Sequence, residues 1–470
     1  MNSSFSPSSP SSKTDSRMKR IRILSIGALL LFGTSGHAQE RRWTLEACIA
    51  HAYQQNIEIK TQELAAAEKR LSLSESKWSY APEFSASAGY SLSTGRVLDP
   101  TTYDFVENQT VSGNNASVGV SLPLFNGLRN HYNLQRAKLD LRSSLLAVET
   151  TRRSVRLNVT ARYLEVLCAE ETIRDAEQVV SELEVQAGKT ERMVEARKVT
   201  MADLLQIRSQ LSDARNDVLT ARNTYEIARL ELCQLLEIED YASFRTVAPD
   251  TARLVRGAPA EDDAVLDAAQ QLPEVESARV GIELARRDLQ LARTAYWPTL
   301  SLAAGYGSSY SDARQKMFQQ ADGTYRYEAY PFFEQYRDNA SSYVSLSLSI
   351  PIFGKFTTRK NVQRQKLALR RAEYALRTAE KQVEKEVTQA LLDARTAWAR
   401  YLGAQEYVAS AEEAARQVGR KYDLGAATVT DYNAAVTTWV KARSQLLQAK
   451  YEYLFKIKTL SYYTNYNNEG

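Results

Sequence analysis

The chain has 470 residues, of which 44% are hydrophobic and 25% charged, a composition typical of a folded protein with two or three domains. Its net charge of +4 is spread over 60 basic and 56 acidic residues, so no basic patch indicates a nucleic-acid partner. Three histidines and three isolated cysteines lack the spacing of metal ligands, and no metal or cofactor is expected. Cys48, Cys168 and Cys233 are predicted to be small buried side chains, with a disulfide between two of them as the alternative.

An enzymatic function is also disfavoured. The sequence contains no phosphate-binding glycine loop and no nucleophile elbow. Its carboxylates are scattered along solvated helix faces, where they do not converge on a pocket.

Residues 1–38 are typical of a secretory signal peptide. From Met18, a basic KRIR segment precedes the apolar residues 23–32, which are too few to span a bilayer as a helix. Small residues at 36–38 then form a cleavage site. The serine-rich residues 1–17 are predicted to be a dispensable extension. Because no cysteine follows at the cleavage point, no N-terminal lipid anchor is expected.

The first copy of a repeated pattern begins with a helix predicted at residues 44–78, followed by a strand at 84–92. After a polar loop at 94–114, a second strand occupies residues 117–127, SVGVSLPLFNG. Apolar residues alternate with small or polar residues in both strands, which predicts one apolar and one polar face. Each strand is expected to have about 9 to 11 residues, enough to cross a hydrocarbon layer when tilted.

A long helix is then predicted over about residues 129–192, and it returns as a second helix over 201–236. Hydrophobic residues recur every seven positions, as in a coiled coil, and the row shifts by four positions between Val155 and Val159. Such a shift locally relaxes the supercoil. The long helix would span on the order of 95 Å.

The same order of elements recurs, which predicts an internal duplication. The first copy covers residues 39–236, a connector covers 237–260, the second copy covers 261–464, and a short tail covers 465–470. The second copy has predicted helices at 265–296, 358–421 and 430–464, strands at 300–306 and 343–350, and a polar loop at 307–342.

Equivalent prolines measure the offset between the copies. Pro82 and Pro298 lie 216 positions apart, whereas Pro123 and Pro351 lie 228 apart, so the second polar loop is longer by 12 residues. This insertion is predicted to belong to the loop and not to the scaffold.

Proline and glycine mark the points where a strand gives way to a long helix. Pro123 with Gly127, and Pro351 with Gly354, are the predicted strand-to-helix junctions. Proline cannot donate a hydrogen bond to a neighbouring strand, and glycine allows a sharp change of direction.

The expected fold class is a mixed α and β membrane protein. Four strands cannot close a barrel, and each unpaired edge group in lipid costs several kcal/mol. Several chains must therefore share one barrel: two would give eight strands and three would give twelve. Ser345, Ser347 and Ser349 would face the lumen, and the alternating apolar residues would face lipid. A β-sandwich shares the alternation, but the long helices and the signal peptide argue against a compact soluble domain.

The order of these elements, together with the motifs at residues 122–127 (LPLFNG), 350–354 (IPIFG) and 422–431 (YDLGAATVTD), resembles TolC-like outer membrane factor proteins over essentially the whole mature chain. The resemblance implies a homotrimer with a 12-stranded outer-membrane barrel and a periplasmic tunnel of twelve helices. It implies docking to a periplasmic adaptor protein and an inner-membrane pump, as the exit duct of a tripartite efflux system. The outer component of a type I protein-secretion system remains an alternative, as does, in another class, a secreted coiled-coil scaffold or adhesin.

The resemblance also implies a gate at the hairpin tips. Tyr422 matches a tyrosine that ties the inner hairpin closed, Asp203 matches the aspartate to which it bonds, and Asp431 matches a ring of aspartates facing the passage. A carboxylate ring at a narrow opening would attract cations. The predicted adaptor contacts at the tips are Arg197, Leu424 and Gly425.

Each gate assignment has a simpler alternative. Asp431 ends the sequence TVTD and can cap the returning helix, and Tyr422 can fill a helix seam. The chain also departs from the family pattern. Ala427 stands where a gating arginine is often found, Ala434 replaces a second ring aspartate, and Arg197 replaces a glycine. The closed state is therefore expected to rest on fewer bonds.

Overall fold

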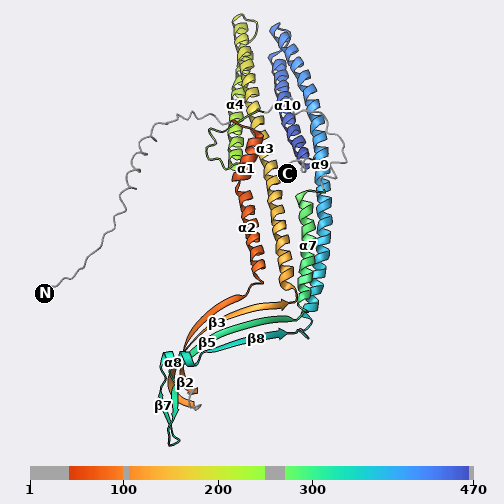
Figure 1. The fold of residues 1–470 in the computed structure, drawn as a ribbon. Coiled ribbons are helices and arrows are strands. Elements are labelled where there is room, and N and C mark those ends of the chain that lie inside the picture. Colours follow the sequence, from red (N-terminus) through yellow and green to blue (C-terminus); the bar gives the residue numbers. More distant parts are fainter. Residues whose placement is uncertain (1–41, 99–104, 249–269, 465–470) are drawn as a thin grey trace, which may run out of the picture.

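The computed structural model describes residues 42–98, 105–248 and 270–464. The predicted signal peptide, residues 249–260 of the connector and the tail lie outside the described residues. Figure 1 shows a curved sheet at one end of the molecule and two long helical hairpins that extend away from it.

The two hairpins have nearly equal dimensions. α3 (Arg129–Glu195) and α9 (Thr357–Asp423) each contain 67 residues, or about 100 Å of helix. They return as α4 (Met201–Leu235) and α10 (Val429–Thr464), with 35 and 36 residues. The predicted bounds of these four helices are confirmed to within three residues. Among the described residues, no helix is both long and apolar enough to cross a membrane.

The heptad rows are confirmed by burial. In α9, Val383, Ala397 and Ala411 are buried, and the other members of the row are half-buried. In α3, Val155 and Val159 are both fully buried, so the row does shift by four positions there. The α7 helix (Pro273–Thr294) packs against the sheet-proximal parts of α3 and α9.

The single helix predicted at residues 44–78 is wrong, because Asn56 divides it into α1 (Leu45–Gln55) and α2 (Ile57–Trp78). The Asn56 side-chain oxygen accepts hydrogen bonds from the N–H groups of Glu58 and Ile59, which caps α2. Its amide nitrogen donates to the carbonyl of Leu235 at the end of α4. The break therefore fixes α1 and α2 against the first hairpin.

A hydrophobic core joins these helices near the middle of the molecule. β1 (Arg42–Trp43) pairs in parallel with β4 (Arg245–Thr246), and the rings of Trp43 and Phe244 stack 5.8 Å apart. The buried Tyr163 hydroxyl lies 2.9 Å from the Trp43 carbonyl oxygen and 2.6 Å from that of Val247. The start of the predicted connector thus belongs to the core.

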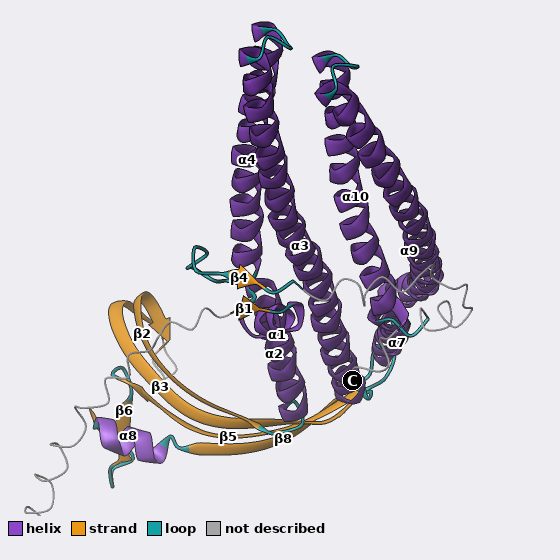
Figure 2. Ribbon diagram, turned by 90° about the horizontal axis from the view of Figure 1, so that it is seen from above, coloured by secondary structure: helices purple, strands orange, loops and turns teal. Residues whose placement is uncertain are grey.

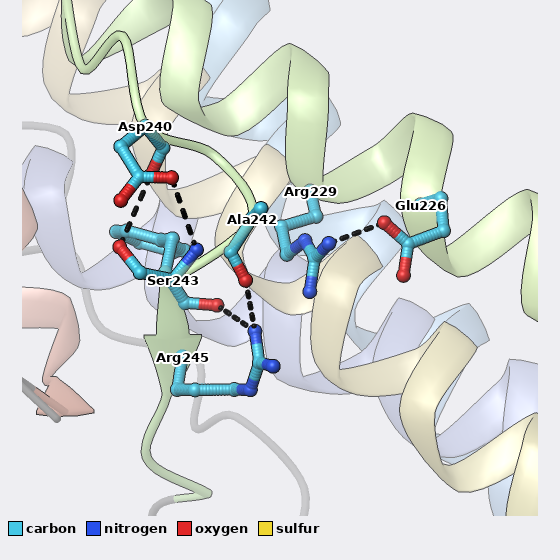
Figure 3. A network of polar contacts seen from close by, with 7 residues as sticks. Glu226, Arg229, Asp240, Ala242, Ser243 and Arg245 are labelled. Carbon is cyan, nitrogen blue, oxygen red and sulfur yellow. Dashed lines mark hydrogen bonds and ion pairs between the residues drawn. The ribbon is translucent and has the colours of Figure 1, made fainter.

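Polar contacts form within the same part of the connector and within the adjacent α4 (Figure 3). Arg229, buried in α4, pairs with Glu226 one turn away. The Asp240 carboxylate accepts a hydrogen bond from the Ser243 N–H, and Arg245 donates to the carbonyl of Ala242 at 2.8 Å. These contacts order the chain as it leaves the first hairpin.

The three cysteines are free thiols. Cys48 and Cys233 are buried in the core, as predicted, and Cys168 is half-buried at its margin. Burial raises the pKa of the Cys48 thiol to about 12 and that of Cys233 to about 11, so both thiols are protonated at neutral pH.

The sheet is antiparallel throughout, in the order β2 (Glu83–Leu98), β3 (Phe105–Asn126), β5 (Thr299–Ser311), β8 (Ser341–Ser349). It is strongly curved (Figure 2). One face carries rows of apolar residues and the other carries rows rich in serine and glycine. One row of paired residues that crosses the four strands is apolar and consists of Phe84, Val120, Ala304 and Val344. The next row lies on the opposite face and consists of Ser85, Gly119, Gly305 and Tyr343.

Two expectations about the loops are wrong. β2 has 16 residues and β3 has 22, so both strands continue into the predicted loop at 94–114. There polar pairs such as the Thr94 and Thr110 hydroxyls, 3.1 Å apart, replace the apolar alternation that marks a strand in sequence. The predicted loop at 307–342 contains β6 (Gln315–Gln319), β7 (Tyr325–Ala329) and α8 (Phe332–Asp338).

The first strand-to-helix junction depends on Gly127. Its φ is +65°, and an added Cβ would lie 2.7 Å from the Trp297 Cβ and 2.9 Å from the Thr294 carbonyl oxygen. Pro123 lies at an irregularity in the pairing of β3 with β5. Only glycine satisfies both the left-handed backbone and the close packing at position 127.

The second junction is built differently from the prediction. Pro351 follows the end of β8, as expected, but Gly354 has open space around its Cβ position and no left-handed backbone. The positive φ angles fall on Lys355 (50°) and Phe356 (60°). The chain reversal assigned to Gly354 therefore occurs at the next two residues, and Lys355, 228 positions after Gly127, is its counterpart.

The two glycines provide a matched pair for mutation. We expect Gly127→Ala to destabilise the protein by about 2 kcal/mol or more, since it adds both left-handed strain and a steric overlap. Gly354→Ala should change stability by less than about 0.5 kcal/mol. Chemical unfolding of the detergent-solubilised protein, followed by circular dichroism, measures both. Equal effects would contradict this account of the junctions.

Candidate functional site

The two hairpin tips share one backbone design. Arg197 and Gly425 adopt left-handed conformations, with φ of 56° and 76°. At each tip, the backbone N–H groups of this residue and of the residue after it donate hydrogen bonds to carbonyl oxygens in the last turn of the long helix, at distances of 2.7 to 2.9 Å. This pair of hydrogen bonds forms a Schellman motif. Arg197 thus holds a backbone that glycine would adopt at lower cost. Arg197, Leu424 and Gly425 are all exposed, and their predicted role in adaptor contact stays a prediction.

Asp203 and Asp431 both cap a returning helix. The Asp203 carboxylate accepts hydrogen bonds from the N–H and hydroxyl of Thr200, each at 2.8 Å, and the Thr200 hydroxyl oxygen accepts from the Asp203 N–H. Thr428 and Asp431 make the same three contacts. Asp431 and Asp203 therefore each cap a returning helix, and the predicted role of Asp431 in a ring of carboxylates stays a prediction.

Capping makes the second tip sensitive to acid. Hydrogen bonds from the hydroxyl and N–H of Thr428 hold the pKa of Asp431 below its ordinary value. A carboxylate with a lowered folded-state pKa stabilises the fold at neutral pH, and this contribution is lost as the pH falls through that pKa. The capping box is thus intact under ordinary periplasmic conditions.

Tyr422 is buried between the two hairpins. It belongs to a tip cluster with Ile207 and Val429, and its ring stacks on that of Tyr432 at 5.5 Å. Its hydroxyl lies 3.5 Å from the Thr190 Oγ1. The predicted Tyr422–Asp203 hydrogen bond is not present among the described residues, in which the Asp203 carboxylate accepts from Thr200 and the Tyr422 hydroxyl lies near Thr190. The contact between hairpins instead runs from Tyr422 to Thr190, and the seam-filling alternative describes Tyr422 well.

Ion pairs across the seam were not anticipated from the sequence. Lys189 of α3 lies 3.7 Å from the carboxylate of Asp423 in α9, close to the tip. Lys450 of α10 pairs with Glu171 of α3 at 2.9 Å, farther from the tip, and Arg443 pairs with Asp175 between these two positions. The Lys189–Asp423 pair is nearly half exposed, and such pairs contribute no more than about 1 kcal/mol.

A polar layer interrupts the apolar seam. On the sheet side of the tip cluster lies an inner cluster of Val179, Leu183 and Ala214, against which Val436 and Val440 of α10 pack. Between the two clusters lie Gln186 on α3 and Asn433 on α10, which are 6% and 5% exposed. The Gln186 amide nitrogen and both amide atoms of Asn433 have no hydrogen-bond partner among the described residues.

This layer makes the closed seam weaker than an apolar seam would be. Each buried polar group without a partner costs about 1–3 kcal/mol. The sequence did carry a signal for it, since Asn433 occupies an apolar row at Val429, Val436 and Val440 with spacings of four, three and four. One polar residue in such a row commonly trades stability for specificity of packing.

We expect the double change Gln186→Leu with Asn433→Leu to strengthen the seam by about 1–2 kcal/mol, because both unpaired groups are removed together. Hydrogen exchange in the first turns of α10 should slow by a factor of about 5–30. Asn433→Asp, which buries a charge at the same place, should accelerate exchange. Faster exchange in the leucine variant would show that the amides stabilise the seam.

No group of three or more His, Cys, Asp and Glu side chains able to hold a metal ion occurs in the parts of the chain that the structure describes. The arrangement instead combines a curved sheet with two chemically distinct faces and two long helical hairpins.

Comparison with known proteins identifies the family. The chain matches the outer membrane efflux protein family over residues 49–236 and 265–465, and it belongs to that family. The outer membrane is therefore its location, with the helices in the periplasm.

Individual relatives are distant. Outer membrane protein TolC of Vibrio cholerae is 22% identical over 422 residues, covering 88% of this chain and 89% of the relative. TolC of Escherichia coli is 23% identical over 315 residues, and the match spans 65% of this chain but only 60% of that protein. The alkaline protease secretion protein AprF of Pseudomonas aeruginosa is 23% identical, over 81% of this chain and 76% of its own.

Solved structures share the fold. A crystal structure of CusC matches with a TM-score of 0.73 at 16% identity, over 89% of this chain and 91% of CusC. The CmeC outer membrane channel of Campylobacter jejuni matches with a TM-score of 0.72 at 18% identity, over 89% of this chain and 85% of CmeC. At these identities the likeness supports the fold and not the role of any residue.

Proposed function

We propose that this chain is the outer-membrane exit duct of a tripartite efflux system, in which three copies share one 12-stranded barrel and one periplasmic helical tunnel. The observation that carries the proposal is the four-stranded sheet, whose outer strands β2 and β8 each have one edge that pairs with no other strand of the described residues. In lipid such edges must pair with other chains. Three chains with four strands each give a barrel wide enough for a passage, whereas eight strands fill with side chains.

The faces of the sheet support the same orientation. Phe84 and Val344, at the two ends of one apolar row, are exposed in the single chain, which suits contact with lipid. The opposite face, with serine and glycine in most rows, suits a water-filled lumen. This architecture suits the export of small molecules that an adaptor and a pump hand over.

A type I protein-secretion duct is the second candidate. The similarity to AprF, whose name describes secretion of an alkaline protease, favours it. Deleting the gene and measuring both drug susceptibility and the secreted protein pattern separates the two. Increased susceptibility with unchanged secretion supports efflux, and the reverse supports secretion.

The basic test of the duct is electrical. Purified protein should insert into planar bilayers as ion-conducting units, with a small conductance in the closed state. A protein that purifies from the periplasm as a soluble monomer and never conducts would contradict the proposal.

For the gate, we expect Tyr422→Ala to raise single-channel conductance or open probability, because truncating a buried aromatic ring removes about 3–5 kcal/mol of packing. Tyr422→Phe should have a small effect, since the hydroxyl contact to Thr190 is as long as 3.5 Å. Tyr407→Ala, on an exposed part of the same helix, is the control. Equal conductance in Tyr422→Ala and wild type would place the constriction elsewhere.

For the ring of carboxylates, we expect Asp431→Asn to weaken block by divalent or trivalent cations added from the tip side. Asp203→Asn is a matched control, because Asp203 makes the same capping contacts at the other tip. If capping alone matters, cation block should change equally in both variants. If the Asp431 charge faces the passage, block should weaken only in Asp431→Asn. Equal changes in cation block would assign Asp431 to capping alone.

A further inference from the structure

The longer second loop is an ordered structure. Gln335 of α8 is fully buried, and its amide nitrogen donates to the carbonyls of Ser311 (2.9 Å) and Tyr330 (3.0 Å). The Gln335 side-chain oxygen accepts from the Ser311 N–H at 3.1 Å. One side chain therefore ties α8 to the end of β5 distant from the helices (Figure 1).

The α8 helix packs on the apolar face of the sheet. Its Phe332 ring lies 5.0 Å from that of Tyr310, and the Tyr336 hydroxyl donates to Asn114 at 2.7 Å. Tyr310 and Asn114 are register partners in β5 and β3. By strand alternation both project to the same side as Tyr306 and Ala304, which belong to the apolar rows. The helix thus covers the central strands on the face assigned to lipid.

The position along the strand is that of a membrane boundary. A tilted strand crosses the hydrocarbon layer in about 9–11 residues, which matches the stretch of β5 from Leu300 to Tyr310. Leu300 pairs with Phe125, next to the periplasmic junction. Tyr310 and α8 therefore lie at the outer interface, where aromatic side chains are enriched.

The outward face of α8 combines an aromatic and a cationic side chain. Phe333 is 84% exposed, and the Arg337 side chain, one turn later on the same face, is 75% exposed. Arg337 contacts Asp338 through its Nε, and the guanidinium has further N–H donors. Such a pair suits the boundary between acyl chains and phosphate head groups.

We propose that α8 is a membrane-surface anchor, in which Phe333 inserts at the acyl–head-group boundary of the outer leaflet and Arg337 binds a lipid phosphate. The proposal rests on the proposed function, because it requires the apolar face of the sheet to meet lipid. A neighbouring copy is a poorer occupant, since copies joined through β2 and β8 meet at the sheet edges and α8 lies over β3 and β5.

Spin labels on the full-length protein in phosphatidylethanolamine–phosphatidylglycerol liposomes test the anchor. Phe333→Cys is compared with Leu346→Cys on the apolar face of β8 and with Tyr325→Cys in β7. Cys168→Ser is included throughout, since Cys48 and Cys233 are buried. Collision rates with oxygen, which partitions into lipid, and with a water-soluble nickel chelate are measured at each site.

The anchor predicts an oxygen-to-nickel collision ratio above one at positions 333 and 346, and below one at 325. A position-333 label as open to nickel as that at 325 would place α8 in water. A label shielded from both reagents would indicate contact with protein. Either result at position 333 overturns the anchor. If the label at position 346 is still exposed to lipid, the proposed function stands. If the label at position 346 is exposed to water, both the anchor and the proposed function are overturned.

The phosphate contact has its own test in the same background. Arg337→Gln should lower the ratio at position 333, because the head-group bond that holds the ring at this depth is lost. Arg326→Gln, in β7, should leave the ratio unchanged. An unchanged ratio in Arg337→Gln would overturn the assignment of Arg337 to a lipid phosphate.

Discussion

Backbone hydrogen bonding at the edges of the sheet constrains the whole architecture. β2 and β8 each have an outer edge of N–H and C=O groups that pairs with no other strand in the part of the chain that the structure describes. In water these groups would be solvated, but in a bilayer each would cost several kcal/mol. The family places this sheet in the outer membrane. In the proposed duct other copies pair with its edges, so oligomerisation is the condition for membrane insertion and the source of the passage.

In the proposed duct the helical hairpins meet a different requirement, since a gate at their seam must hold closed and still separate. Two apolar clusters hold it, one around Tyr422 and one around Leu183. The unpaired amides of Gln186 and Asn433 lie between them and oppose closure. The Lys189–Asp423 pair near the tip is exposed and adds little. In the proposed gate, a seam of this kind keeps the free-energy difference between the closed and open states small.

Sequence patterns predicted the parts of the fold where burial repeats. Residues seven positions apart must share one buried stripe, so the long helices were located to within three residues. The Asn56 break and the polar hairpin beyond Thr94 carry no apolar period, and both were missed. At the second junction the sequence predicted the turn at Gly354, yet the left-handed backbone lies at Lys355. The presence of a glycine does not reveal its φ angle. The tip contacts of Tyr422, with Ile207, Tyr432 and Thr190, come from three different helices, and spacing within one helix cannot predict them.

The central claim, that three chains share one sheet, is tested most directly by native mass spectrometry of protein extracted from outer membranes and kept unheated. The account predicts one species with the mass of three mature chains, which dissociates to single chains only on heating. A stable species of one or two chains, inserted in the membrane with β2 and β8 unpaired or closed as eight strands, would contradict it.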